Sequence, residues 1–254
     1  MNEDPYGEVT ARFYDTAYAR LRDPSGDREF YLGLAREAGG PVLELGCGTG
    51  RTLLPIARAG IPCTGLDASP AMLAALHRKN PPSTVRLVRA PMEKFDLQND
   101  RFALIFSAFR AFQHLVTLEQ QLHCLECVRR HLAPGGLLAF DVFTPRLDRI
   151  AIVEESERED VRFEQDGEEV VRHTSVERDL TRQVMQVRMR YERRRGGGVV
   201  GEDVVEFSMR YFFRYELEHL LTRAGFSDLS FLGNFDGRPY DYHAGETICL
   251  ARIC

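Results

Sequence analysis

The feature that most constrains the fold is a run of three alternate glycines between an apolar segment and a helical one. Pro41 to Leu45 forms a short predicted strand, and Gly46, Gly48 and Gly50 follow it. A helix is predicted from Arg51 to Ala59. This order of strand, glycine loop and helix favours a parallel sheet whose loop brings bare backbone close to a ligand, because glycine has no Cβ.

Strands and helices continue to alternate along the chain, which predicts an α/β fold. Further strands are predicted at residues 61–66, 85–88, 102–106, 137–143, 229–235 and 247–252. Helices are predicted from Pro70, with Ser69 as N-cap, and at residues 118–132 and 215–223. These segments predict a seven-stranded, mostly parallel sheet with helices on both faces.

The segment from 146 to 195 has a different pattern, with 12 Lys/Arg and 13 Asp/Glu among its 50 residues. Apolar residues alternate with polar ones from Met185 to Tyr191 and again from Val205 to Tyr211. A period of two is typical of strands with one buried face, and a charged linker lacks it. We therefore expect an antiparallel β insert at 146–211, its sheet covering about 161–211, within a core formed by 1–145 and 212–254.

Asp67 ends the second predicted strand, 21 positions after Gly46. A carboxylate at that place can accept both hydrogen bonds from a ribose diol. Dinucleotide-binding domains share this layout but carry G-x-G-x-x-G, whereas the third glycine here comes one residue earlier and Glu44 precedes the loop.

The G-x-G-x-G variant resembles motif I of the class I S-adenosylmethionine-dependent methyltransferases, in their small-molecule branch. Residues 67–73, 132–138 and 209–225 resemble later motifs of that family, in family order. The resemblance implies a Rossmann-like methyltransferase fold, S-adenosylmethionine as cofactor with S-adenosylhomocysteine as product, and an insert that covers the substrate pocket.

The resemblance also assigns cofactor contacts. The glycine loop would line the methionine part of the cofactor, Asp67 would hold the ribose, and Tyr14 would close over the site as part of an N-terminal lid. The full set of implied cofactor residues is Tyr14, Gly46, Cys47, Gly48, Gly50, Asp67, Ala68, Met72, Pro91, Met92, Glu93, Ser107 and Phe109. Pro91 stands where family members commonly carry an Asp for the adenine amino group, so Met92 N–H or Glu93 would have to take that role.

Methyl transfer from a sulfonium mainly requires alignment in a dry site, so few catalytic groups are expected. The segment after the fourth strand borders the transferring methyl in this family. His114 and Tyr14 are the candidate catalytic residues, and His114 acts as base or as an anchor for the acceptor. As a base it would titrate near its reference pKa, about 6.5. The candidate acceptor-pocket residues are Arg110, His114, Tyr211, Tyr240 and Tyr242.

The remaining composition excludes several classes of partner. A net charge of −5 disfavours nucleic acid, and the sequence contains no apolar run of about 20 residues for a membrane. The start has no signal-peptide pattern, so we expect a cytoplasmic monomer or homodimer. His123, Cys127 and His131 lie too far apart along one helix to share a metal, and no metal is expected.

The sequence thus predicts a methyltransferase that acts on a small molecule, with N-methylation favoured. An O-methyltransferase stays open, and an RNA methyltransferase, an NAD-dependent oxidoreductase and a non-catalytic cofactor-binding protein are less favoured.

Overall fold

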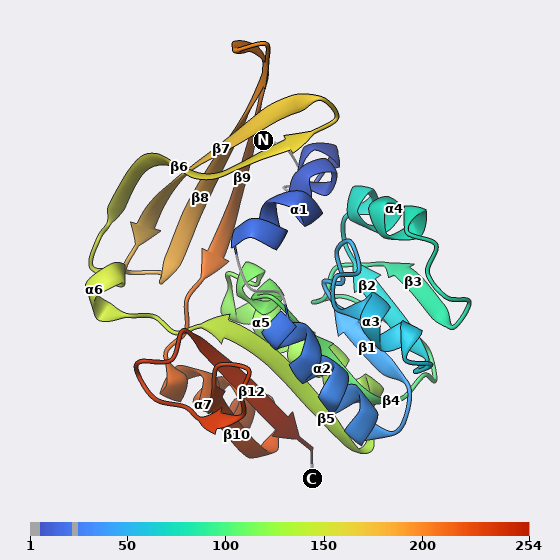
Figure 1. The fold of residues 1–254 in the computed structure, drawn as a ribbon. Coiled ribbons are helices and arrows are strands. Elements are labelled where there is room, and N and C mark those ends of the chain that lie inside the picture. The colour runs from blue at the N-terminus through green and yellow to red at the C-terminus, as the bar shows by residue number, and fades with distance from the viewer. Residues whose placement is uncertain (1–5, 22–24, 254) are drawn as a thin grey trace.

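The computed structural model describes residues 6–21 and 25–253, and its largest element is an eight-stranded sheet (Figure 1). In spatial order the strands are β11 (Arg238–Pro239), β10 (Ser227–Gly233), β12 (Glu246–Arg252), β5 (Leu132–Phe143), β4 (Phe102–Ser107), β1 (Val42–Leu45), β2 (Cys63–Asp67) and β3 (Val85–Arg89). Strands β1 to β5 pair in parallel, and β10, β11 and β12 are antiparallel. The seven predicted strands are all present, and the two-residue β11 adds an eighth at the edge.

Helices cover both faces of this sheet. The helices of the described residues are α1 (Glu8–Leu21), α2 (Ser25–Ala38), α3 (Leu53–Arg58), α4 (Pro70–Arg78), α5 (Leu118–His131), α6 (Leu147–Ile150) and α7 (Arg214–Arg223), with a 3-10 turn η1 (Ala111–His114). Of these, α2, α3 and α4 pack on one face of the main sheet and α5 and α7 on the other. The predicted N-cap is confirmed, because the Ser69 hydroxyl accepts a hydrogen bond from the Met72 amide.

Burial on both faces explains why apolar residues of β1 point to both sides of the sheet. All four of its residues are buried. Leu43 and Leu45 join the core formed with α5 and α7, whereas Val42 joins the core formed with α2 and α3. The pattern is typical of a central parallel strand.

A second, four-stranded antiparallel sheet stands beside the main sheet. Its strands are β6 (Glu154–Gln165), β7 (Glu168–Asp179), β8 (Val184–Arg195) and β9 (Gly198–Arg210), paired in that order. The sheet begins at Glu154, earlier than predicted, because the charged stretch before Val161 lacks the alternation that marks a strand.

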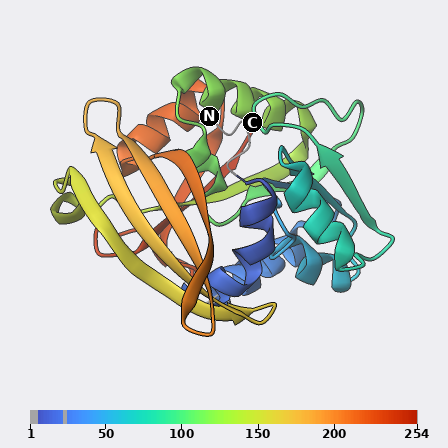
Figure 2. The same cartoon turned by 90° about the horizontal axis from the view of Figure 1, so that it is seen from above.

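Helix α1 lies between this second sheet and α4 (Figure 2). Phe13 and Ala17 of α1 are buried in the apolar cluster of the second sheet, and the Phe13 ring stacks on Tyr191 at 5.3 Å. On the opposite side of the helix, Ala11 packs against Met72 of α4. The N-terminal helix therefore bridges the two sheets.

Candidate active site

A cavity of about 1270 Å³ opens at the carboxyl ends of the parallel strands, between the main sheet, α1 and the second sheet. One wall contains residues 46–49, 66–70, 89–93, 108–111 and 114–116, which end or follow β1, β2, β3 and β4. The facing wall contains Tyr6, Tyr14 and Tyr18, and then Met185, Val187, Met189, Phe207, Ser208 and Met209 of the second sheet. Ligands bind at this end of open parallel sheets.

The glycine loop forms the part of the wall nearest β1. Gly46 has a φ of +70°, and a Cβ there would lie 2.9 Å from the Ala111 Cβ, so the position requires glycine. Gly48 has a φ of +52° with open space around it. Gly50 lies outside the cavity lining, and a Cβ there would lie 2.8 Å from the Leu76 Cγ. Gly50 therefore packs against α4, and its cofactor contact stays a prediction.

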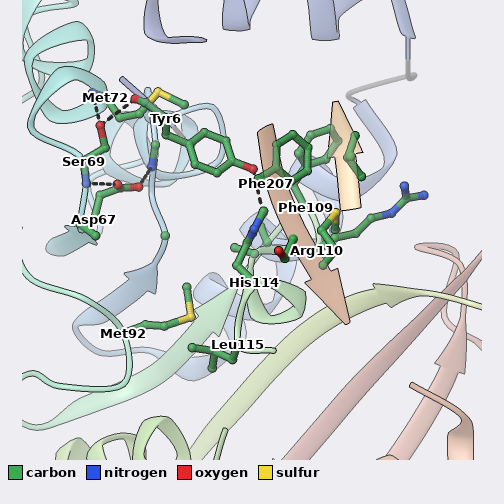
Figure 3. A pocket seen from close by; sticks show the side chains of 18 of the residues that line it. Tyr6, Asp67, Ser69, Met72, Met92, Phe109, Arg110, His114, Leu115 and Phe207 are labelled. Carbon is green, nitrogen blue, oxygen red and sulfur yellow. Dashed lines mark hydrogen bonds between the residues drawn. The ribbon is translucent and has the colours of Figure 1, made fainter. Parts of the chain in front are cut away.

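Asp67 lies in the same wall and connects two loops (Figure 3). Its Oδ2 accepts a hydrogen bond of 2.7 Å from the Gly48 amide, and its Oδ1 accepts one of 2.8 Å from the Ser69 amide. An ionised carboxylate has about four acceptor sites, so these two amides do not exhaust it. The carboxylate is thus held in a fixed orientation at the edge of the cavity.

Glu44 contributes a second carboxyl group to the cavity. Burial raises the pKa of Glu44 well above its usual value, an effect that Arg51 opposes. Its Oε2 atom has no hydrogen-bond partner among the described residues. A buried acceptor in a cavity wall is satisfied when a donor from a ligand reaches it.

Arg51, whose charge acts on Glu44, is held in place by an ion pair. It makes two hydrogen bonds to the buried Asp27, of 3.0 and 2.6 Å, and its guanidinium lies 4.5 Å from the centroid of the Phe109 ring. Phe109 therefore packs against a clamped cation, which holds the ring at the cavity wall.

Phe109 and Arg110 form a strained turn directly after β4. Both are non-glycine residues in the left-handed region, with φ of 60° and 65°. The fully buried Asp141 of β5 accepts hydrogen bonds from both backbone amides, at 2.8 and 2.9 Å, and a third from the Tyr31 hydroxyl at 2.8 Å. Asp141 therefore stabilises a backbone geometry that each residue disfavours by about 1–3 kcal/mol.

Replacing Asp141 with asparagine is expected to destabilise the protein, because one amide N–H of the turn would then face an NH₂ group. A buried donor left without an acceptor costs about 1–3 kcal/mol. Thermal or urea unfolding measures the loss. The exposed carboxylate of Asp100, which pairs with Arg86, supplies the control Asp100→Asn. Equal stabilities of the two variants would remove the role assigned to Asp141.

His114 and Tyr6 meet in the middle of the cavity (Figure 3). The Tyr6 hydroxyl lies 2.7 Å from the His114 Nε2, and the Phe207 ring lies 5.5 Å from the imidazole. Burial lowers the pKa of His114 to about 4, although a hydrogen bond with the Ser208 backbone opposes the shift. Because that bond places the imidazole proton toward Ser208, we assign Nε2 as the acceptor of the Tyr6 O–H.

The neutral state of folded His114 makes stability depend on pH in a defined window. The folded pKa is about 4 and the unfolded value is 6.5, so between these limits only the unfolded chain gains the proton and stability falls as pH falls. From pH 7 to pH 5 this group alone should remove about 2 kcal/mol. Urea unfolding at both pH values should show a weaker pH dependence in His114→Gln. The same dependence in both proteins would contradict the assignment.

Most sequence-predicted site residues border this one cavity, whereas Gly50 and four others lie outside its lining. Tyr14, Gly46, Cys47, Gly48, Asp67, Ala68, Met72, Pro91, Met92, Glu93, Phe109, Arg110 and His114 line it. Ser107 is buried outside the lining, and its carbonyl accepts a long bond from the Tyr31 hydroxyl. Tyr211, Tyr240 and Tyr242 also lie outside it, and the Tyr242 hydroxyl accepts from the Leu147 amide instead. The structure therefore does not bring these three tyrosines to the predicted acceptor pocket.

Sequence reasoning missed two residues that shape the site. Tyr6 contacts His114 across 108 positions, and no motif marks it. Asp141 sits inside an apolar strand, where a lone buried carboxylate was an available signal.

The residues that the structure describes contain neither a candidate metal site nor a candidate membrane-spanning helix. No group of three or more His, Cys, Asp or Glu side chains could hold a metal ion there. None of the helices in that part combines the length and apolar composition that crossing a bilayer demands.

Comparison with known proteins identifies the class of this fold. The CcbJ methyltransferase from Streptomyces caelestis superposes with a TM-score of 0.78 at 24% identity, covering 100% of both chains. The sugar N-methyltransferase KedS8 from Streptoalloteichus sp ATCC 53650 gives 0.78 at 23% identity, covering 100% of this chain and 96% of that one. These likenesses establish the Rossmann-like methyltransferase fold.

Sequence comparison matches part of the chain to methyltransferases. Residues 42–136 match a family described as a methyltransferase domain. The cypemycin N-terminal methyltransferase of a Streptomyces species is 27% identical over 140 residues, 55% of this chain and 57% of that protein. The chain spans about half the length of the curated relatives it matches. Over the matched residues the chain is similar to methyltransferases, and its fold is that of the class I S-adenosylmethionine-dependent methyltransferases.

Proposed function

We propose that this protein transfers the methyl group of S-adenosylmethionine to an amino nitrogen of a small molecule, such as an amino sugar or a related metabolite. The observation that carries the proposal is the pair of Tyr6 and neutral His114, placed between the glycine loop and the second sheet. Of the similar proteins, KedS8 is named as a sugar N-methyltransferase and another as a cypemycin N-terminal methyltransferase.

The residues of the glycine-loop wall fit the cofactor. Gly46 and Gly48 expose backbone where a side chain would fill the space, and Asp67 presents acceptors for a ribose diol. The unpartnered Glu44 Oε2 suits an amino-group donor, such as that of a methionine moiety. When bound, S-adenosylmethionine supplies an electrophilic methyl group on a sulfonium.

Tyr6 and His114 would position the acceptor amine. With its proton donated to Nε2, the Tyr6 oxygen keeps lone pairs that can accept an N–H from the amine. An amine that arrives unprotonated needs alignment and no strong base. A histidine whose pKa is about 4 is suited to this role and is a weak base for a hydroxyl. This favours N-methylation over the alternative, O-methylation.

Helix α1 would act as the lid that keeps water out. Asp15 accepts a hydrogen bond of 2.6 Å from the Thr49 hydroxyl of the glycine loop and pairs with Lys79 of α4 at 2.6 Å. Tyr14 lines the cavity beside Tyr18, at 4.5 Å between ring centroids. We therefore assign Tyr14 to the lid, and Tyr6 to the contact with His114.

Calorimetry with S-adenosylhomocysteine and with NADH tests the class of cofactor, and binding of the first alone is expected. A methyl-transfer screen on paired amino and hydroxy sugars, read by mass spectrometry, tests the acceptor. Methylation confined to the hydroxy sugars would overturn the N-methylation proposal. In this proposal the protein works in the cytoplasm without a nucleic-acid or membrane partner.

A further inference from the structure

We propose that the acceptor carries an oxyanion, a carboxylate or a phosphate, which arginines on the acceptor side of the cavity bind. The inference rests on the proposed function and names the chemistry of its substrate. The arginines in question come from α6, its flanks and the second sheet, and are Arg146, Arg149, Arg158, Arg172 and Arg178.

The charge of the cavity is opposite to that of the protein. The chain has a net charge of −5, yet its cavity is lined by eight arginines and four carboxylates. Three of those carboxylates, Glu44, Asp67 and Glu93, lie on the cofactor side. On the acceptor side Glu155 is the one carboxylate in the lining, and Asp148 and Asp160 outside the lining pair with Arg146 and Arg172, so that five arginines face three carboxylates. A cavity lined this way favours an anionic occupant.

Two of these arginines are buried and keep a donor without a partner. Arg172 is 2% exposed, and Asp160 clamps it through Nε and Nη2 at 3.0 and 2.8 Å. The Nη1 atom of Arg172 has no hydrogen-bond partner among the described residues. Arg178 is 8% exposed, and its Nε atom also has no partner among them. Both residues border the cavity, and buried donors are normally satisfied by protein, water or ligand.

At the mouth of the cavity there are more arginine side chains than carboxylates to pair with them. Glu155 is shared, since Oε1 contacts Arg178 and Oε2 lies 3.4 Å from Arg158. Arg149 is exposed and forms no ion pair with any residue in the described part of the chain. An incoming oxyanion would supply the missing carboxylate, because guanidinium groups bind carboxylate and phosphate in matching geometry.

An apolar surface separates these arginines from the Tyr6–His114 pair. It consists of Met185, Val187, Met189, Phe207 and Met209 of the second sheet. The occupant that fits is an amine with an apolar body and an oxyanion at its far end.

The test uses small anions that need no knowledge of the acceptor. Protein loaded with S-adenosylhomocysteine is titrated with inorganic phosphate, acetate and acetamide, and binding is followed by ligand-observed NMR. Acetamide has the shape of acetate without the charge. Charge-assisted hydrogen bonds predict that one of the anions binds at least about tenfold more tightly than acetamide. Tighter binding of phosphate indicates that the acceptor carries a phosphate group, and tighter binding of acetate indicates that it carries a carboxylate.

A double variant, Arg149→Gln with Arg158→Gln, should weaken anion binding about tenfold and leave affinity for S-adenosylhomocysteine unchanged. The matched control is Arg182→Gln, an exposed arginine on the β7–β8 turn outside the cavity. Anions that bind no better than acetamide, or that bind the double variant as well as the wild type, overturn the inference. If the wild-type protein does not bind S-adenosylhomocysteine, the proposed function is overturned instead. Anion binding can still be measured in the absence of S-adenosylhomocysteine, so the two outcomes are distinguishable.

Discussion

Replacing Asp67 with alanine is expected to lower the affinity for S-adenosylmethionine by about tenfold to a hundredfold, since charge-assisted hydrogen bonds contribute about 1.5–3 kcal/mol. The carboxylate lies at the end of β2 and is oriented by the amides of Gly48 and Ser69. Its loss removes the proposed acceptor for the ribose diol and also the acceptor of the Gly48 amide in the glycine loop. Calorimetry with S-adenosylmethionine measures both effects together.

The isosteric Asp67→Asn variant separates these effects. Asparagine retains one acceptor oxygen, so it should keep part of the loop geometry while losing the charge. Asp100→Ala, which removes an exposed carboxylate paired with Arg86, is the control and should bind as the wild type does. An unchanged affinity in Asp67→Ala would withdraw the ribose assignment.

The part of the site built by neighbouring residues could be predicted from the sequence. Gly46, Gly48 and Asp67 are positioned by local backbone: a loop after one strand and the last residue of the next. Parallel strands end at the same edge of a sheet, so their order along the chain is enough to bring these residues together.

Contacts between distant segments could not be predicted in this way. Tyr6 reaches His114 because α1 crosses from the second sheet to α4, a placement set by packing of Phe13 and Ala11 on opposite faces of one helix. A period of two showed that strands of the insert bury one face, but it did not show what that face covers. Tyr211 was assigned to the pocket as a residue of the insert. It follows β9 and lies outside the cavity lining, whereas Phe207 and Met209 of that strand line the cavity.

Burial also altered a chemical prediction for His114. A histidine at its reference pKa would titrate close to neutral pH, but desolvation in the cavity lowers the pKa to about 4. The pKa of His114 is thus set by its surroundings in the folded protein, which its place in the sequence does not reveal.

His114→Ala is expected to raise the KM for the acceptor more than it lowers kcat, because the neutral imidazole orients Tyr6 and takes no proton. Tyr6→Phe, which removes the hydroxyl and keeps the ring, should reproduce most of this change. A general base would behave differently, since its removal lowers kcat by about a hundredfold or more. Steady-state kinetics on an accepted amine distinguish these two outcomes.

The pH–rate profile provides the independent measurement. A positioning histidine with a pKa of about 4 contributes no ionisation between pH 5.5 and 8, so the rate should rise with pH as the acceptor amine itself loses its proton. The rates of wild type and His114→Ala should then depend on pH in the same way and differ only in absolute value. An acidic limb near pH 6–7 that vanishes in His114→Ala, together with a large fall in kcat, would establish general-base catalysis. Such a result would favour a hydroxyl acceptor, because an amine needs no base of that strength.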